Sequence, residues 1–468
     1  MVSVEKRDFG SAHKTSVALY CIRSPGGLEA DITTWGAAVV SVRVPNRDGV
    51  VEEVTLNHRT LPGIRGQDAY YGATIGRVAS TIAGARYRLG GKEHTVSANV
   101  NGVHHAHGGF QGFDKQVWAA EVVPGAADSS SAAVRFTYIS IDGEEGYGGC
   151  LTASVTYIVT VQNHLIIEYR ATTDKPTPIN LTNHTYWNLS GECQDTIHRH
   201  TLRVHASRMQ KSPVDSSHLV DVETDTPYDF REPRVIGKMI KAAGVNGYDH
   251  VFVLDAINRP EPEPEAKLAA GEPDLASTSS MCGDQVGSPL FGSQQMREAA
   301  VLMDGESGRV MSVTTNQPCL IVYTANHLPR AKRKPPQLPP SGGKGVVAEE
   351  VGDKARRDGR QLEPELTHRR HGAVCLEAVN FIGSLRFNAL PTMVLQPGHT
   401  YHHRTVHHFT TIDTAHVDHS DGMGESANGV KPHSQSDVDV ARDDGAFQLP
   451  LSSRVKGTCA GAAEVASL

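Results

Sequence analysis

Short runs in which apolar and polar residues alternate recur along the first 412 residues of the chain. Five of them are long enough to predict strands: residues 38–44, 133–139, 151–161, 164–169 and 319–323. An alternation with a period of two places the apolar side chains on one face of a strand, and glycine, aspartate and asparagine separate the runs. No long stretch repeats its apolar residues at the 3.6-residue spacing of a helix. The pattern predicts an all-β fold, a large antiparallel β-sandwich.

Three stretches break this pattern. Residues 258–297 are rich in Pro, Glu, Ser and Gly, residues 329–370 are charged and glycine-rich, and residues 413–468 are poor in large apolar side chains. Segments of this composition cannot bury enough apolar surface to offset the entropy of ordering the chain. We therefore predict one domain over residues 1–412 with disordered, mobile insertions at 258–297 and 329–370, followed by a disordered C-terminal tail.

Composition and charge argue against some classes of binding partner. The 468 residues carry a formal net charge of -7, with 39% hydrophobic and 21% charged residues, which is typical of a globular chain with a real core. Mild acidity argues against nucleic acid or an anionic membrane as partner. No apolar run approaches the roughly 20 residues of a membrane span, and the first residues lack the apolar core of a signal peptide. Seven scattered cysteines without a C-x-x-C pair suggest reduced thiols. We expect a cytoplasmic protein, with a monomer as the default.

The segment 177–191 carries the strongest candidate chemistry. Its composition favours a strand, yet Asn180, Asn183, Tyr186 and Asn188 crowd hydrogen-bonding groups around His184. A histidine held by its neighbours can act as a general acid or base, because its unperturbed pKa lies near neutrality. The alternative is a histidine that only satisfies a buried polar network. The segment alone leaves both interpretations open.

This segment closely resembles the signature of the galactose mutarotases (aldose 1-epimerases), with Trp187 where the family has phenylalanine. Seven further blocks resemble family blocks and stand in family order: residues 72–79, 107–115, 142–147, 247–250, 317–318, 375–381 and 395–401. The resemblance implies two large curved sheets stacked face to face. It also implies an enzyme that interconverts the α and β anomers of free aldohexoses such as galactose and glucose, with no cofactor.

The resemblance assigns the catalytic roles. Glu377 matches the family's general base, His184 matches its general acid, and His107 supports the acid. A cyclic aldose opens when a base removes the C1 hydroxyl proton while an acid protonates the ring oxygen, so one carboxylate and one imidazole suffice. For an isolated Leu-Glu-Ala a salt-bridged strand carboxylate would be the better interpretation. By the same resemblance, the residues that contact the sugar or lie beside the acid are Thr185, Tyr186, Asp249 and Gln317.

One departure from the family concerns the sugar site. The family commonly follows its G-R-V-A block with Asn-Arg, and this chain has Ser80 and Thr81 there. The family's arginine contacts the sugar, so its loss removes a charge-assisted hydrogen bond that typically contributes about 1.5–3 kcal/mol. Arg77 is kept, but the alternation of a strand need not bring it to the same place. The small pair Ser80 and Thr81 is expected to border the sugar and could make room for a larger substrate.

Other kinds of site and function are less well supported. The histidine clusters 104–107 and 402–408 lack cysteine or carboxylate at a useful spacing, so we expect no metal, and no G-x-G-x-x-G turn or P-loop indicates a nucleotide. The paired carboxylates at 144–145 are better explained as a glycine-flanked turn. A hexose-phosphate 1-epimerase would need converging arginines. A non-catalytic sugar-binding protein would need neither His184 nor Glu377, and a two-carboxylate glycosidase would need a second acid beside Glu377.

Overall fold

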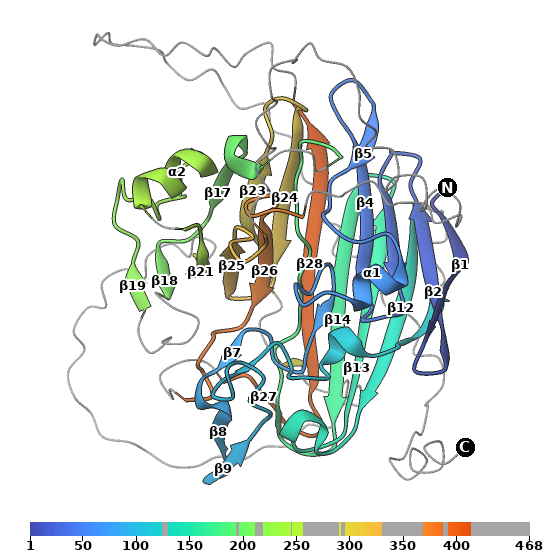
Figure 1. Ribbon diagram of the computed structural model, residues 1–468, viewed down its shortest axis with the longest axis vertical. Coiled ribbons are helices and arrows are strands. Elements are labelled where there is room, and N and C mark those ends of the chain that lie inside the picture. Colours follow the sequence, from blue (N-terminus) through green and yellow to red (C-terminus); the bar gives the residue numbers. More distant parts are fainter. Residues whose placement is uncertain are drawn as a thin grey trace, which may run out of the picture. The chain divides into compact units, whose positions relative to one another are not determined.

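The computed structural model of the chain describes residues 1–123, 130–192, 196–210, 219–244, 246–255, 290–291, 295–329, 368–386 and 392–412. Most of these residues lie in or between antiparallel strands, which confirms the predicted all-β class (Figure 1). The five predicted runs all form strands. The predicted tail and most of the two predicted insertions lie outside the described residues, and within the first insertion residues 290–291 form a short strand.

Among the described residues, the largest sheet has ten strands. In spatial order nine of them are β11 (Ala119–Val123), β12 (Ser131–Ser140), β13 (Leu151–Thr160), β14 (His164–Thr173), β28 (Thr400–Thr411), β24 (Arg309–Thr315), β23 (Arg297–Met303), β17 (Thr201–Val204) and β20 (Arg234–Val235). The tenth, β22 (Leu290–Phe291), runs parallel to β28, whereas the other pairs are antiparallel. Figure 1 shows the orange strand β28 between the teal and the yellow halves of this sheet.

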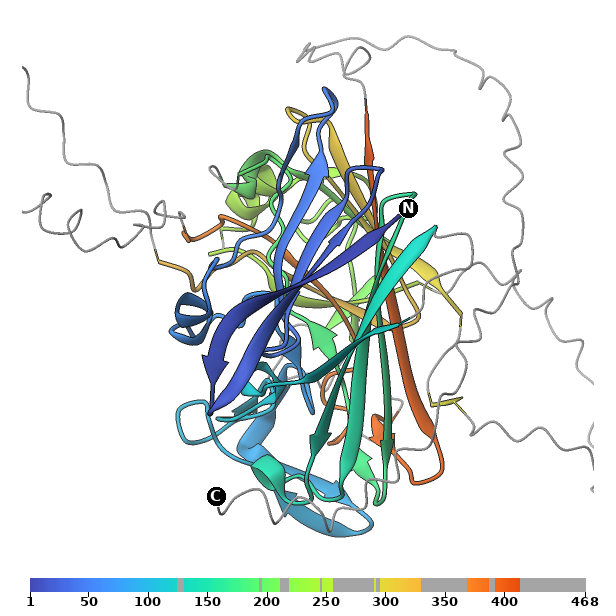
Figure 2. The same cartoon turned by 90° about the vertical axis from the view of Figure 1, so that its right-hand side faces the viewer.

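Two five-stranded sheets accompany it. The first consists of β1 (Ser3–Ala12), β2 (Thr15–Arg23), β3 (Glu29–Thr33), β4 (Val39–Pro45) and β5 (Val51–Glu53). The second has the order β19 (Leu219–Asp221), β18 (Arg208–Gln210), β21 (Asp249–Val253), β25 (Cys319–Tyr323) and β26 (Cys375–Val379). In Figure 2 the blue strands of the first sheet lie across the teal strands of the ten-stranded sheet.

Short elements connect the sheets. Four two-stranded pairs join β7 (Thr81–Ile82) to β10 (His105–Ala106), β6 (Thr74–Ile75) to β16 (Thr182–Asn183), β15 (Thr177–Pro178) to β27 (Val394–Leu395), and β8 (Arg86–Leu89) to β9 (Lys92–Thr95). In the described part of the chain the helices are α1 (Leu61–Arg65), α2 (Ile236–Ala243) and the 3-10 turns η1 (Ala83–Ala85), η2 (Phe113–Lys115), η3 (Glu144–Gly146) and η4 (Ile197–Arg199). Thr60 caps α1 by accepting from the Gly63 amide.

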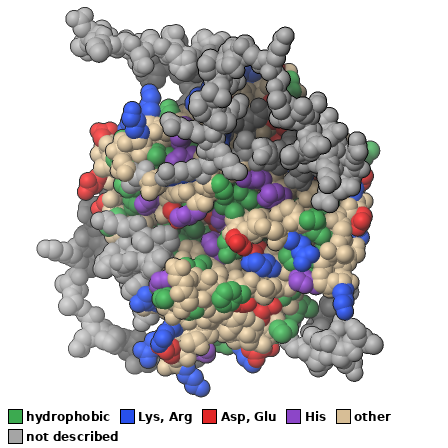
Figure 3. Space-filling view, viewed as in Figure 1, with side chains coloured by type: hydrophobic (Ala, Val, Ile, Leu, Met, Phe, Trp, Pro, Cys, Tyr) green, Lys and Arg blue, Asp and Glu red, His purple; other side chains and the backbone are tan. Residues whose placement is uncertain are grey.

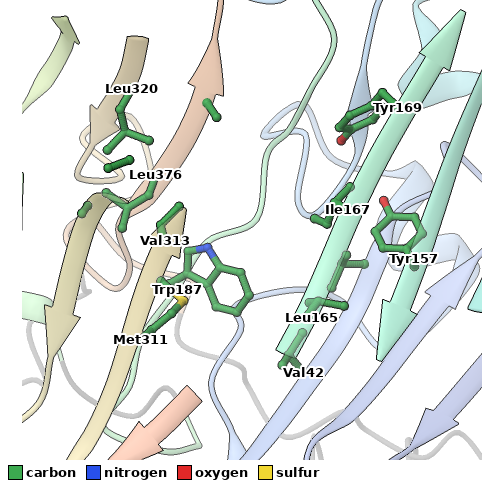
Figure 4. Close-up of a cluster of buried hydrophobic side chains, with 14 of the residues drawn as sticks. Val42, Tyr157, Leu165, Ile167, Tyr169, Trp187, Met311, Val313, Leu320 and Leu376 are labelled. Carbon is green, nitrogen blue, oxygen red and sulfur yellow. The ribbon is translucent and has the colours of Figure 1, made fainter. Parts of the chain in front are cut away.

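One apolar core unites the three large sheets. It includes Val42 of the first sheet, Ile167 of the ten-stranded sheet and Leu376 of the second five-stranded sheet, all of them buried. Figure 4 shows Trp187 between side chains of β14 and β24. Full burial of one such side chain contributes about 1.5–3 kcal/mol. Because Trp187 belongs to the segment 177–191, this core anchors the candidate catalytic segment.

Strand β28 explains one of the two histidine clusters. Its residues alternate between buried and partly buried from Thr400 to Phe409, so His403 and His407 point inward. His403 contacts the Leu181 carbonyl at 3.0 Å through Nδ1 and the Thr405 hydroxyl at 2.8 Å through Nε2. Burial lowers the pKa of His403 to about 3 and that of His407 to about 4, so both rings are neutral parts of the core.

Candidate active site

A cavity of about 620 Å³ opens over strands β21, β25 and β26. Five histidines are among its described lining residues, and Figure 3 shows histidine side chains on the middle of the face it draws. The described lining residues are His58, Gln67, Asp68, Ala69, Tyr70, Tyr71, Ser80, Thr81, His107, His184, Tyr186, Asp249, Ile321, Tyr323, His327, Leu328, Pro329, His368 and Glu377.

Strand register places two carboxylates in this cavity. Ile321 of β25 pairs with Glu377 of β26, and Tyr323 pairs with Asp249 of β21. Side chains two residues apart on a strand point to the same face, so the partners of Ile321 and Tyr323 share that face as well. The four side chains consequently line the same cavity, although Asp249 and Glu377 are far apart in the sequence.

The backbone around His184 is fixed by the segment before β6. The His184 amide donates to the Ala73 carbonyl at 3.0 Å, and the His184 carbonyl accepts from the Gly72 amide at 2.9 Å. Gly72 has a φ of +62°, and a Cβ at this position would lie 1.9 Å from the Val39 carbonyl oxygen. Only glycine fits there, because any side chain would break this close approach.

His184 and Glu377 meet in the wall of the cavity. His184 Nε2 lies 3.5 Å from Glu377 Oε1, and the two side chains are 6% and 2% exposed. On the other side of the ring, His184 Nδ1 lies 3.6 Å from Cys375 Sγ. The second carboxylate oxygen, Glu377 Oε2, is buried without a hydrogen-bond partner among the described residues. A buried polar atom of this kind is costly unless something bonds to it, and here it is available to a hydroxyl of a bound molecule.

Burial controls the protonation of this pair. It raises the pKa of Glu377 well above its ordinary value of 4.5, and the nearby charge of Asp249 raises it further. Burial also lowers the pKa of His184 to about 3, with a smaller contribution from His107. Both shifts favour the uncharged forms, so the proton that the two groups share rests on the carboxyl in the protein alone.

Aromatic rings and a second histidine surround His184. The ring of Tyr186 stacks on it with centroids 5.0 Å apart, and the ring of Tyr70 lies 6.0 Å away. His107 lies edge-on to His184 at 5.5 Å, and its Nδ1 accepts from the Ser80 amide at 3.4 Å. Burial lowers the pKa of His107 to about 4, so His107 is neutral, and its proton is left on Nε2.

A carboxylate fixes the loop that follows His107. Glu145 accepts from the Phe110 amide at 3.0 Å and from the Gln111 amide at 2.8 Å. Glu145 itself lies in η3 with a φ of +51°, next to Gly143 and Gly146, so the predicted glycine-flanked turn is confirmed. The turn supports the candidate site from outside the cavity.

Residues 18–408 match the family model described as Aldose 1-epimerase. The chain belongs to the aldose 1-epimerase family. Galactose mutarotase of Mus musculus is 30% identical over 410 residues, which cover 86% of this chain and 98% of that protein. Aldose 1-epimerase of Escherichia coli (strain K12) is 37% identical over 246 residues, 51% of this chain and 68% of that protein. The solved structure of galactose 1-epimerase from Lactobacillus acidophilus NCFM is similar in fold, with a TM-score of 0.62 at 20% identity, and covers 88% of this chain and 99% of that one.

Most of the residues that the sequence analysis placed at the site of this aldose 1-epimerase family member lie together. The cavity lining includes His107, His184 and Glu377, and also the predicted sugar contacts Ser80, Thr81, Tyr186 and Asp249. Their assigned roles remain predictions.

Two predicted residues do not line the cavity. The hydroxyl of Thr185 donates to the side chain of Asn183, and Thr185 is not among the described lining residues. The side-chain Nε2 of Gln317 donates to Asn316 Oδ1 at 3.1 Å, ahead of β25. Their contacts with sugar stay predictions.

Arg77 forms its hydrogen bonds away from the cavity, in keeping with the expectation that it need not take the place of the family's arginine. Its guanidinium donates to the Ser140 hydroxyl at 2.8 Å, to the Ile141 carbonyl at 2.9 Å and to the Gly148 carbonyl at 3.0 Å. The side chain is buried, and it is not part of the cavity lining. Arg77 therefore does not replace the arginine that the family has where this chain has Thr81.

Several lining residues were missed in the sequence. Tyr323 belongs to an alternating run that reads as core, and Tyr70 precedes the block 72–79 without a motif of its own. His368 falls inside a stretch predicted to be an insertion, yet its ring lies 4.3 Å from that of His58 and 4.8 Å from that of Tyr71. The aromatic content of residues 68–71 was the one signal that could have drawn attention to this wall.

One group of three potential metal ligands lies within the described part of the chain. Ligand atoms of His184, Cys375 and Glu377 lie within 4.8 Å of one another. Cys375 and Glu377 nevertheless face opposite nitrogens of the His184 ring, and one ion can bond only one of these. Burial also raises the pKa of both the thiol and the carboxyl, which keeps them protonated. This donor set does not fit a resident cation.

None of the described helices is both long and apolar enough to cross a bilayer.

Proposed function

We propose that the protein is an aldose 1-epimerase that interconverts the α and β anomers of free aldohexoses such as galactose and glucose. The observation that carries the proposal is the buried pair of His184 and Glu377, 3.5 Å apart in the cavity wall, with one unpartnered carboxylate oxygen. Membership of the aldose 1-epimerase family supports the reaction class, and the names of its relatives support the choice of sugar.

The pair can carry both proton transfers of the reaction. Sugar hydroxyls that donate to Glu377 stabilise its carboxylate and counter the effect of burial on its pKa, so the shared proton moves to Nε2 of His184. Glu377 then takes the C1 hydroxyl proton while His184 gives its Nε2 proton to the ring oxygen, and the ring opens. Rotation about the C1–C2 bond exposes the other face of the aldehyde. In closure the two residues exchange roles, and the opposite anomer forms.

The charges of the cavity favour a neutral sugar over a sugar phosphate. Asp68, Asp249 and Glu377 contribute carboxyl groups, and none of the described lining residues is an arginine or lysine. A phosphate site needs convergent cationic donors, as bidentate arginines provide. The hexose-phosphate alternative is therefore disfavoured.

Polarimetry tests the proposal. Freshly dissolved α-glucose and α-galactose should equilibrate faster with purified protein than without it. The corresponding 6-phosphates, corrected for their own spontaneous rates, should be accelerated far less. Acceleration of neither free sugar would refute the proposal, and a preference for the phosphates would favour the alternative.

A further inference from the structure

Cys375 lies behind the catalytic pair and has no role in the reaction described so far. It is fully buried on β26, two residues before Glu377, and so faces the same side of the sheet. Its Sγ lies 3.6 Å from Nδ1 of His184, whereas Glu377 lies on the Nε2 side of the ring. Cys375 is not among the described residues that line the cavity, so it acts on His184 and not on a sugar.

We propose that Cys375 is a positioning residue for His184, whose Nδ1–H donates to the thiol sulfur, so that Nε2 is the nitrogen that exchanges a proton. This inference rests on the proposed epimerase function. It assigns the tautomer of the neutral ring: a proton stays on Nδ1 throughout, and the Nε2 lone pair faces Glu377.

The chemistry of the pair requires this tautomer. A neutral imidazole carries one N–H, and the other nitrogen must accept. If the fixed proton lay on Nε2, His184 would have no lone pair on the side of Glu377, and the shared proton could not pass from the carboxyl to the ring. Among the described side chains, Cys375 is the one whose hydrogen-bond contact reaches Nδ1, and the backbone of His184 itself also contacts the ring. A hydrogen bond to the second ring nitrogen commonly sets which nitrogen reacts.

A neutral thiol suits this position. Burial raises the pKa of Cys375 well above its ordinary value of 9, and nearby carboxylates raise it further, so the sulfur carries no charge. A thiolate would stabilise the imidazolium form and hold the proton on His184. A neutral sulfur, which is a weak acceptor, orients the ring without trapping that proton.

The alternative is that Cys375 only fills the core, and Cys319 provides the matched control. Cys319 is a second fully buried cysteine, on the neighbouring strand β25, where it pairs with Val379. Replacing either cysteine by alanine removes the same atoms from the same sheet. Only the change at residue 375 removes an acceptor from His184.

The test compares Cys375→Ala, Cys375→Ser and Cys319→Ala with the wild type by steady-state kinetics on α-galactose and by ¹⁵N NMR of histidine-labelled protein. In the wild type His184 should be an Nδ1-protonated neutral ring. Cys375→Ala should lower kcat about three- to tenfold, the range expected for one ordinary hydrogen bond, with KM unchanged and the tautomer shifted toward Nε2–H. Cys375→Ser, which keeps an acceptor, should restore much of kcat, and Cys319→Ala should change neither readout.

The tautomer measurement keeps this inference separate from the proposed function. A wild-type protein that epimerises no aldose would refute the function, and the NMR spectrum would still decide the tautomer. An Nε2-protonated His184 in the wild type would overturn the positioning role, as would a Cys375→Ala protein that matches Cys319→Ala in kcat and tautomer. If Cys375→Ala fails to fold, Cys375→Ser and the wild-type spectrum still decide.

Discussion

Two side chains in the cavity wall share one proton, and burial keeps both of them uncharged. Burial and Asp249 raise the pKa of Glu377, while burial lowers that of His184 to about 3. These shifts keep the shared proton on the Glu377 carboxyl. A ligand that stabilises the carboxylate reverses this preference, and the proton then passes to the His184 ring. At the scale of single residues, the proposed activity is therefore expected to depend on this pair.

Removing either member of the pair should nearly abolish turnover. Glu377→Gln keeps the shape of the side chain but cannot accept a proton, and His184→Asn keeps a polar group without an acid. Each change should lower kcat by at least about 10²-fold, the usual scale for a positioned acid or base. Steady-state polarimetry measures the effect, with circular dichroism as the check on folding. Turnover near that of the wild type in either variant would show that the substituted residue is not the catalytic acid or base.

Restoring the family's residues at positions 80 and 81 should strengthen catalysis. Ser80 has a φ of +65°, a conformation that asparagine tolerates well, so Ser80→Asn should fit. Thr81→Arg would add a charged donor to a cavity whose described lining has none, and such a donor helps most when the oxygen it faces becomes negative. The double variant should raise kcat/KM on galactose or glucose with little change in stability.

The same double variant also tests whether the cavity is shaped for a ligand larger than an aldohexose. If the cavity is shaped for a larger ligand, the arginine would clash or block it. An unchanged or lower kcat/KM on both sugars would show such a clash. It would favour an altered substrate or a non-catalytic sugar-binding protein.

At the scale of elements, the turn η3 holds the loop that follows His107. Glu145→Ala removes the acceptor of the Phe110 and Gln111 amides. We expect a loss of about 1–2 kcal/mol in the free energy of unfolding and a several-fold loss of kcat, because the loop no longer fixes His107. Glu93→Ala, which removes an exposed carboxylate from β9, is the control. Equal activity of the two variants in the same assay would show that the loop does not depend on Glu145.

The sequence predicted elements better than their arrangement. The five alternating runs became β4, β12, β13, β14 and β25, because alternation is a local consequence of one buried face. The neighbours of each strand were not predictable. β14 pairs with β28, whose partner residues lie more than two hundred positions further along the chain, and no local pattern carries that information.

The site residues also divide into those that the sequence predicted and those that only the fold reveals. His184, Glu377 and His107 could be named because each stands in a motif, and the cavity indeed brings them together. Tyr323, His368 and Cys375 were missed as site residues, because their contacts arise only from register and from chain crossings. A cysteine beside a motif glutamate reads as core until the fold places it against the histidine.

At the scale of the whole molecule, buried histidines make the fold sensitive to acid. His107 and His407 have pKa values lowered to about 4, and His184 and His403 to about 3, from an ordinary value of 6.5. Between pH 6.5 and about 4 the unfolded chain binds protons that the folded protein does not. Stability is therefore retained above pH 6.5 and lost as pH falls, by at most about 1.4 kcal/mol per histidine and pH unit.

Denaturant unfolding at a series of pH values measures this loss. The free energy of unfolding should fall between pH 7 and 5, and His407→Gln, which cannot take up a proton, should make the slope shallower. Glu377 works in the opposite direction, as Asp114 and Asp249 do, because a raised pKa favours the folded state only at low pH, but the histidines with a lowered pKa outnumber these three carboxyls. A flat profile between pH 7 and 5 would show that the buried rings titrate normally.

We propose that the His184 and Glu377 pair opens and closes the ring of a free aldose. Two-dimensional exchange NMR on galactose at anomeric equilibrium can observe this reaction, because it follows conversion in both directions without a coupled enzyme. We predict exchange cross-peaks between the α and β anomeric protons that depend on the protein and disappear with Glu377→Gln. The absence of such cross-peaks with the wild-type protein, or their persistence at full strength in Glu377→Gln, would show that this pair does not catalyse the interconversion.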